Sequence, residues 1–343
     1  MSTKHQSDLV ARKIRSLIIE DDGKDVLVCN TGHSWSVAKL LLLGQWADLY
    51  STIIQSNFPK SRYRFVDLLA GAGKTRLKKT KGKLIKGSVF VVDTFSQKHP
   101  FSKYILVEKN TKKCEALRQI TQPFGDRCEV ILNDTNKVVD ELFSCLTDHN
   151  LVFVDNQGFN VEWKTIETVM RAKADIIINY PTASFERVSQ YAKCSDKLDL
   201  FFGDDSWREA TFSRTYSTKL YMNNLKASFE RIKREITTME MPAYVSNIRL
   251  GTDTYFYDII LVCRDGPYTH YWDDLKNDWS PKNCKRLIDF INDKTSRLDW
   301  FEGFSAKVEA LDKSKRKQID PNENLQRFLE NALNQHRALS ENS

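Results

Sequence analysis

The stretch Asp67-Leu-Leu-Ala-Gly-Ala-Gly73 follows directly on the apolar run Arg64-Phe-Val-Asp67. An apolar run that ends in an acid and continues into a glycine turn is typical of a buried strand followed by a ligand-binding loop. Glycine lets the backbone approach a bound molecule, and the main-chain NH groups of such a turn can contact an anionic group. We therefore expect a nucleotide-like ligand here. The candidate residues are Asp67, Ala70, Gly71 and Gly73.

Four more apolar runs end in a polar or acidic residue, at 104–108, 129–134, 151–155 and 175–179. Helical patterns lie between them, at 112–121, 136–146 and 161–172. Such alternation of strand and helix predicts a parallel sheet that is covered by helices on both faces.

Two later segments rich in strand-forming residues, 244–250 and 255–263, are separated by a connection of hairpin length. Five parallel strands followed by a hairpin is the seven-stranded, Rossmann-like plan of class I methyltransferases, whose last strand runs antiparallel. We therefore predict an α/β fold of this type. The expected divisions are an N-terminal segment or lid at 1–36, the Rossmann-like methyltransferase domain at 37–266, and a small helical C-terminal appendage with a tail at 267–343.

The positive charge of the chain is concentrated in one segment. Lys and Arg total 52 against 45 acids, a net charge of +7, and segment 74–86 alone holds seven bases and no acid. Blocks of like charge usually repel, stay solvated and attract polyanions. We expect a basic loop that contacts nucleic acid, either DNA or RNA, although an acidic protein partner would also be attracted. The candidate substrate-binding residues of this loop are Lys74, Arg76, Lys78 and Lys79.

The same glycine turn nearly matches a phosphate-binding P-loop, because Gly73-Lys-Thr75 is the required ending and Asp155 is available for magnesium. The P-loop pattern needs glycine at position 68, where the Cβ of Leu68 obstructs a backbone that wraps a phosphate. Asp67 would also place negative charge near the phosphates. S-adenosylmethionine carries an ammonium and a sulfonium, so nearby acids favour it. The turn therefore favours this cofactor, with a P-loop-like NTPase left as an alternative.

Polar residues at successive strand ends complete the predicted site, because open α/β sheets bind ligands beyond the carboxyl ends of their strands. Glu108 can accept both hydrogen bonds from a ribose diol, and Asn133 with Asp134 can read an adenine edge. Asp155 and Asn156 lie where a methyl acceptor would meet the sulfonium, and both can accept hydrogen bonds from an exocyclic amine. The turn that contains them can equally be a plain turn of good turn formers.

Three residues outside these strand ends are further substrate-binding candidates. His33 and Lys39 precede the first strand and can reach over the cofactor or substrate as a lid, although His33 can equally cap the helix that follows. Tyr180 can stack on a base, or the proline after it can simply end the strand.

Residues 24–265 resemble the three-Cys-motif partner protein family, which is methyltransferase-like. The matching segments are His33-Ser-Trp-Ser-Val-Ala-Lys39, Phe65-Val-Asp-Leu-Leu-Ala-Gly-Ala-Gly73, Gly87-Ser88, Leu106-Val-Glu-Lys109, Phe153-Val-Asp-Asn-Gln-Gly158, Ile178-Asn179, and Phe202-Gly203 with Trp207. Lys109 in the fourth segment joins the cofactor-binding candidates. The usual Asp-Pro-Phe/Tyr-Gly of the family is changed by Asn156-Gln157. Because amine methyltransferases hold the target base with a proline and an aromatic residue in this turn, a non-catalytic cofactor- or nucleic-acid-binding module is a second alternative.

The composition of the chain indicates the cellular compartment of the protein and the kinds of site that it lacks. The N-terminus lacks the apolar run of a secretion signal, and the apolar stretch 37–54 is interrupted by polar residues, so it predicts a buried amphipathic helix and no membrane span. Seven cysteines form no Cys-x-x-Cys pair, which argues against a zinc site and a disulfide framework. The sequence therefore predicts a cytoplasmic S-adenosylmethionine-dependent methyltransferase without a bound metal, acting on nucleic acid.

Overall fold

The computed structural model describes residues 3–21, 28–33, 35–78, 80, 82–146, 148–210, 213–251, 256–295 and 298. Residues 1–302 form one compact unit. Most of the predicted tail therefore lies outside the described residues, as does Lys79.

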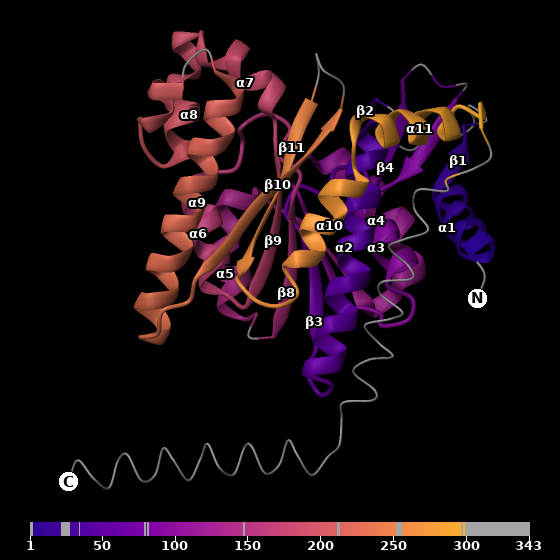
Figure 1. Cartoon of the computed structure of the whole chain (residues 1–343), viewed down its shortest axis with the longest axis horizontal. Helices are drawn as coiled ribbons and strands as arrows, with labels where there is room; N and C mark the ends of the chain where they lie inside the picture. Colours follow the sequence, from indigo (N-terminus) through magenta and orange to yellow (C-terminus); the bar gives the residue numbers. More distant parts are fainter. Residues whose placement is uncertain are drawn as a thin grey trace, which may run out of the picture. The chain divides into compact units, whose positions relative to one another are not determined.

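The centre of the unit is a seven-stranded sheet with the order β10-β11-β9-β8-β3-β6-β7 (Figure 1). The five strands β9, β8, β3, β6 and β7 are parallel to one another, and β11 runs antiparallel to both β9 and β10. Their bounds are β3 Tyr63–Asp67, β6 Lys103–Glu108, β7 Cys128–Leu132, β8 His149–Val154, β9 Ala174–Tyr180, β10 Ala243–Gly251 and β11 Phe256–Arg264. This topology confirms the predicted Rossmann-like class I methyltransferase sheet.

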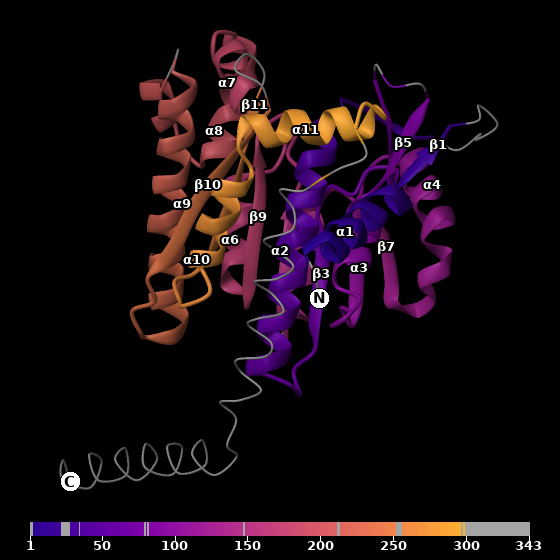
Figure 2. The ribbon, with the colours of Figure 1, turned by 45° about the vertical axis from the view of Figure 1, so that its right-hand side comes forward.

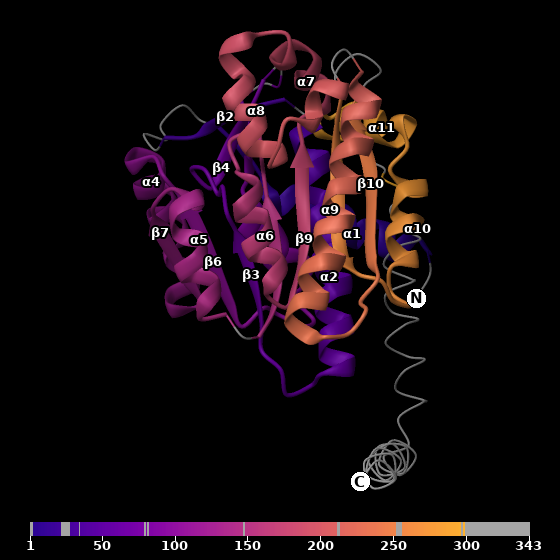
Figure 3. The ribbon, with the colours of Figure 1, turned by 90° about the vertical axis from the view of Figure 1, so that its left-hand side faces the viewer.

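Helices cover both faces of this sheet, as the apolar strands require. One face packs against α5 Thr135–Ser144, α6 Trp163–Arg171 and α9 Arg214–Thr237, which lie in front of the sheet in Figure 3. The other face is covered by α2 Trp35–Asn57 and α3 Ser88–Phe95, and α1 Thr3–Leu17 packs on α3 (Figure 2). The remaining helices are α4 Thr111–Thr121, α7 Thr182–Ser189, α8 Ser195–Phe202, α10 His270–Asp278 and α11 Pro281–Ile291.

Helix α2 is buried along most of its length, because the sheet, α3, α10 and α11 surround it. Trp272 of α10 packs edge-on against Trp46 of α2 at a centroid separation of 5.2 Å. The indole of Trp279 donates a hydrogen bond of 2.8 Å to Gln45 Oε1, which satisfies a buried polar group inside α2. The helical segment after residue 266 is thus packed into the same unit as the sheet.

The described residues of the basic segment 74–86 include two paired strands, so the prediction that the segment is a loop is wrong for these strands. Strands β4 Lys74–Leu77 and β5 Lys83–Lys86 pair antiparallel, and they join β1 Ile18–Glu20 and β2 Asn30–Gly32 in a second sheet with the order β1-β5-β4-β2. Apolar residues of the hairpin are buried, and acids from other segments pair with its bases. Three of its bases are thus buried or paired with an acid, namely Lys74, Arg76 and Lys83.

Two general features concern the described residues only. No helix among them combines the length and apolar character that crossing a membrane requires. They also contain no group of three or more His, Cys, Asp or Glu side chains suited to a metal ion.

Candidate functional site

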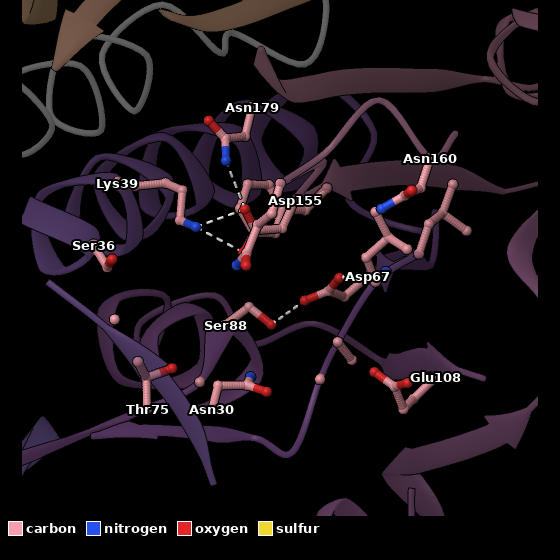
Figure 4. A pocket seen from close by; sticks show the side chains of 18 of the residues that line it. Asn30, Ser36, Lys39, Asp67, Thr75, Ser88, Glu108, Asp155, Asn160 and Asn179 are labelled. Carbon is pink, nitrogen blue, oxygen red and sulfur yellow. Dashed lines mark hydrogen bonds and ion pairs between the residues drawn. The ribbon is translucent and has the colours of Figure 1, made fainter. Parts of the chain in front are cut away.

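A cavity of about 380 Å³ opens at the carboxyl ends of the central parallel strands (Figure 4). Its size falls within the range of roughly 300–1,000 Å³ that is usual for small-molecule sites. Eleven of the predicted site residues line it, namely His33, Lys39, Asp67, Ala70, Gly71, Lys74, Glu108, Lys109, Asn133, Asp134 and Asp155. The fold therefore brings together residues that are spread over more than 100 positions of the sequence.

The glycine loop is fixed by hydrogen bonds to the two strands beside β3. The backbone NH of Leu68 donates to Phe153 O at 3.0 Å, and that of Ala70 donates to Val107 O at 2.9 Å. Gly71 has a φ of +64°, and a Cβ there would lie 2.2 Å from Nδ2 of Asn30. Strand β2 of the second sheet thus packs directly on the loop, which explains why this position requires glycine.

Gly73 does not line the cavity, in contrast to its predicted cofactor contact. It has a φ of +70°, and a Cβ there would lie 2.5 Å from Ile120 and 2.7 Å from Leu117 of α4. Its backbone oxygen accepts a hydrogen bond of 2.6 Å from the NH of Gly87, where α3 begins. The hairpin is thus inserted between the glycine loop that follows β3 and the start of helix α3. Because a strand and not a helix follows Gly73, the chain lacks the loop-to-helix geometry of a P-loop.

Asp67 is a buried carboxyl group at the base of the loop, with 2% of its surface exposed. The Ser88 hydroxyl donates to one carboxylate oxygen, and the NH of Leu69 donates to the other at 2.9 Å. Burial raises the pKa of Asp67 to about 7, while these two hydrogen bonds act in the opposite direction. Both donors are neutral, so this carboxylate is suited to a cationic ligand group.

The ends of β6 and β7 contribute the predicted ribose and adenine residues. Glu108 lies in the cavity wall, and its Oε1 accepts a hydrogen bond of 2.7 Å from the NH of Asn110. Lys109 forms an exposed ion pair of 3.4 Å with Asp134. Asp134 also caps α5 by accepting from the NH of Asn136 at 3.0 Å, and Asn133 Oδ1 accepts from the NH of Asp134 at 2.8 Å. The cap accounts for Asp134 structurally, so its presence alone does not imply ligand binding.

At the end of β8, Asp155 is held in a network that includes a predicted lid residue (Figure 4). Nζ of Lys39, from α2, lies 2.6 Å from Oδ1 and 2.7 Å from Oδ2 of Asp155. Nδ2 of Asn179, at the end of β9, donates to Oδ1 at 2.8 Å, and Nε2 of Gln157 donates to Oδ2 at 3.3 Å. The side chains of Lys39 and Asp155 are 7% and 16% exposed. A largely buried ion pair thus forms part of the cavity wall.

Several predicted residues lie away from the cavity. Asn156 is fully buried, and its Oδ1 accepts from the NH of Asn160 at 2.9 Å, so it shapes the turn and does not face the cavity. Tyr180 is also fully buried and packs against Phe159 and other aromatic rings, so the prediction that it stacks on a base is wrong. Its ring partners lie just before α6, in α8 and in α9, and sequence periodicity does not reveal these contacts.

The hairpin candidates have separate locations. Lys74 is buried in the cavity wall, whereas Arg76 lies outside it and pairs through Nε with Asp21 at 2.7 Å. Lys78 is exposed at the far end of β4. Arg76 and Lys78 are thus both exposed, as predicted, although Arg76 is paired with an acid, whereas Lys74 is not solvated.

Several polar residues of the cavity were missed as site residues, among them Asn30, Ser36, Ser88 and Asn179. Ser88 and Asn179 lay within segments that carry the family resemblance, and Asn179 ends a predicted strand, so a strand-end rule applied to every strand would have included it. Asn30 enters through the second sheet, for which the sequence offers no comparable signal.

Comparisons with known proteins give no family assignment. No known protein-family model matches the chain, and no curated protein matches it. The resemblance to the three-Cys-motif partner family therefore stays a prediction.

Solved structures align with the chain only at low identity. Trm1 from Pyrococcus horikoshii with S-adenosyl-L-methionine is 11% identical over 65% of this chain, which spans 55% of the Trm1 chain, at a TM-score of 0.38. TYW2 from M. jannaschii in complex with AdoMet is 11% identical over 64% of this chain and 75% of its own, at 0.31. The plantazolicin methyltransferase BpumL in complex with SAH is 12% identical over 68% and 88%, at 0.34. These scores carry no functional conclusion, and the fold assignment rests on strand order and direction.

Proposed function

We propose that the protein is an S-adenosylmethionine-dependent methyltransferase. The observation that carries this proposal is the convergence of the glycine loop, Glu108, and the ends of β7 and β8 on one cavity in a sheet of class I methyltransferase topology. The cofactor supplies an electrophilic methyl group on a sulfonium, and the carboxylate of Asp67 suits its positive charge. Glu108 would hold the ribose, and Asn133 with Asp134 would read the adenine edge.

Calorimetry with S-adenosylmethionine tests the cofactor half of this proposal. Glu108→Ala should weaken binding at least about tenfold, because a charged acceptor shared by two ribose hydroxyls is lost. Glu115→Ala removes an exposed carboxylate from the nearby helix α4 and should leave the affinity unchanged. Absence of binding to the unaltered protein would rule out the proposed function.

The proposed acceptor is a nucleic acid, which would approach along the exposed base Lys78 and the cavity-lining Lys109 and Lys113. This part rests on charge, since phosphates attract such bases. Incubation with tritiated cofactor and either total RNA or total DNA should label one of them. Labelling of acidic proteins alone would replace the nucleic acid by a protein partner.

A second candidate function is a non-catalytic module with the same fold. Both oxygens of Asp155 already accept hydrogen bonds from Lys39 and from neighbouring amides, so this carboxylate is occupied before any substrate arrives. Cofactor binding without methyl transfer to any macromolecule would favour the module over the enzyme.

A further inference from the structure

The polar groups around the end of β8 differ in what they can still offer to a substrate. Oδ1 of Asp155 accepts from Lys39 and Asn179, and Oδ2 accepts from Lys39 and Gln157. A Lys ammonium has three N–H groups, of which two are directed at Asp155, so one remains. In Asn179, the amide nitrogen points to Asp155 and the oxygen points away (Figure 4).

Asn179 Oδ1 is buried and accepts no hydrogen bond from the described part of the chain, although the residue lines the cavity and is only 5% exposed. A buried acceptor without a partner is costly, and a bound substrate donor would remove this cost. Because Lys39 Nζ and Asn179 Nδ2 both bond Oδ1 of Asp155, they flank the same atom. The two side chains that hold Asp155 thus carry one further donor, on Lys39, and one further acceptor, on Asn179.

An amine acceptor fits this arrangement poorly. One of its N–H groups could donate to Asn179 Oδ1, but the other would seek carboxylate oxygens that are already bonded, and the amine would lie beside a cationic Lys39. A hydroxyl group fits it fully, since one lone pair can accept from Lys39, the O–H can donate to Asn179 Oδ1, and the second lone pair can face the methyl group. We propose that the methyl acceptor is a hydroxyl oxygen and that Lys39 is the catalytic residue that contacts it.

This inference rests on the proposed methyltransferase function. In the transfer, the new O–CH3 bond forms while the C–S bond breaks, and the electron pair of the C–S bond stays on sulfur, which becomes a neutral thioether. Lys39 first passes one of its three ammonium protons to Asp155. The freed lone pair of Nζ then takes the hydroxyl proton as the O–H group turns from Asn179 Oδ1 to Nζ, and Asp155 later releases its proton to water. The sulfonium charge is lost, one proton is released, and Lys39 ends as it began.

A hydroxyl acceptor also distinguishes RNA from DNA as the substrate. Each internal nucleotide of RNA carries a 2′-hydroxyl, whereas internal nucleotides of DNA carry no free hydroxyl. The acceptor we infer is therefore the ribose 2′-hydroxyl of RNA.

Alkaline hydrolysis of labelled RNA tests this inference directly. RNA from cells that lack the protein is incubated with tritiated S-adenosylmethionine, in parallel with DNA. A 2′-O-methyl group blocks cleavage of the adjacent phosphodiester, so the label is expected in alkali-resistant dinucleotides, with none in DNA. Label in mononucleotides, label in DNA, or no transfer to RNA would overturn the inference. If calorimetry shows cofactor binding in those cases, the assigned acceptor fails without the cofactor site failing.

Variants of the ion pair give a second test. Lys39→Met and Asp155→Asn should each lower transfer to RNA at least about 100-fold, the usual effect of losing a general acid–base group. Their affinity for S-adenosylmethionine should stay within about threefold, because neither group is assigned to the cofactor. The double variant Lys39→Met/Asp155→Asn leaves no unpaired buried charge and serves if a single variant does not fold.

The matched control is Lys164→Met, which breaks an exposed Lys–Asp pair of 3.6 Å with Asp140, away from the cavity. It should transfer methyl groups at the unaltered rate. Retention of full transfer by Lys39→Met would overturn the role of Lys39.

Discussion

At the residue scale, Asp67 is a titratable group that links stability to pH. Burial raises its pKa from the usual 3.8 to about 7. The folded protein therefore binds the proton more tightly than the unfolded chain, and this residue's contribution to the free energy of unfolding falls as pH rises from about 4 to about 7. Asp48 and Asp175, whose pKa values burial raises to about 6 and about 7, act in the same direction.

Asp67→Asn should flatten part of this pH dependence, because the amide keeps the shape and cannot ionise. Between pH 4 and pH 8, the free energy of unfolding of the variant should rise by up to about 4 kcal/mol relative to that of the unaltered protein. The pKa of Asp67 lies about three units above its usual value, and each unit corresponds to about 1.4 kcal/mol. Urea unfolding at a series of pH values measures the difference. Asp126→Asn, at an exposed position before β7, should keep the original profile. If Asp67→Asn left the dependence of stability on pH unchanged, the raised pKa of Asp67 would be contradicted.

At the scale of elements, the glycine loop depends on how it packs on α4 and β2. Gly73 and Gly125 both have a positive φ, +70° and +54°, but only Gly73 has neighbours within 4 Å of the position that a Cβ would take. The two positions therefore separate backbone strain from close packing.

Gly73→Ala should lower the free energy of unfolding by about 2–4 kcal/mol, the sum of left-handed strain and overpacking against Leu117 and Ile120. Gly125→Ala should lower it by only about 1–2 kcal/mol, from strain alone. Chemical denaturation of both variants gives the comparison. Equal losses would show that packing on α4 contributes nothing at Gly73.

At the scale of the whole molecule, the second sheet decides which bases of segment 74–86 remain available to phosphates. Nζ of Lys83 is buried, donates to the carbonyl oxygen of Ile291 at 2.7 Å and pairs with Asp293, so it joins the hairpin to the end of α11. Of the seven bases in segment 74–86, Lys74 and Lys83 are buried and Arg76 is paired. Fewer charges of this segment are thus available to phosphates than its composition indicates.

The salt dependence of RNA binding separates the two kinds of base. Lys78→Ala should reduce the magnitude of the slope of log K against log[salt] by about 0.7, the value for one phosphate contact on a single strand. Lys83→Ala should leave the slope unchanged and instead lower the free energy of unfolding by about 1–3 kcal/mol, because the buried carbonyl oxygen of Ile291 loses its donor. Filter binding between low and moderate salt measures both slopes. A reduced slope for Lys83→Ala would contradict its structural role.

The central sheet and the strand-end residues of the cavity were predictable because their signals are local. Each apolar run ends at an acid or amide, and in a parallel sheet all such ends meet at one edge. This rule placed Asp67, Glu108, Asn133, Asp134 and Asp155 around one cavity from their positions alone, and the structure confirms that they line it.

Contacts between distant segments could not be read in the same way. The pairing of Lys39 with Asp155 spans 116 positions, and the approach of Asn30 to Gly71 depends on strand β2 joining β4. The sequence by itself determined the succession of five parallel strands and a hairpin, and the acids at the strand ends, through hydrophobic period and chain order. Tertiary structure alone decided which bases are neutralised, that Tyr180 is in the core and that Lys39 pairs with Asp155. Those outcomes depend on side chains that become neighbours only when the sheets and helices pack.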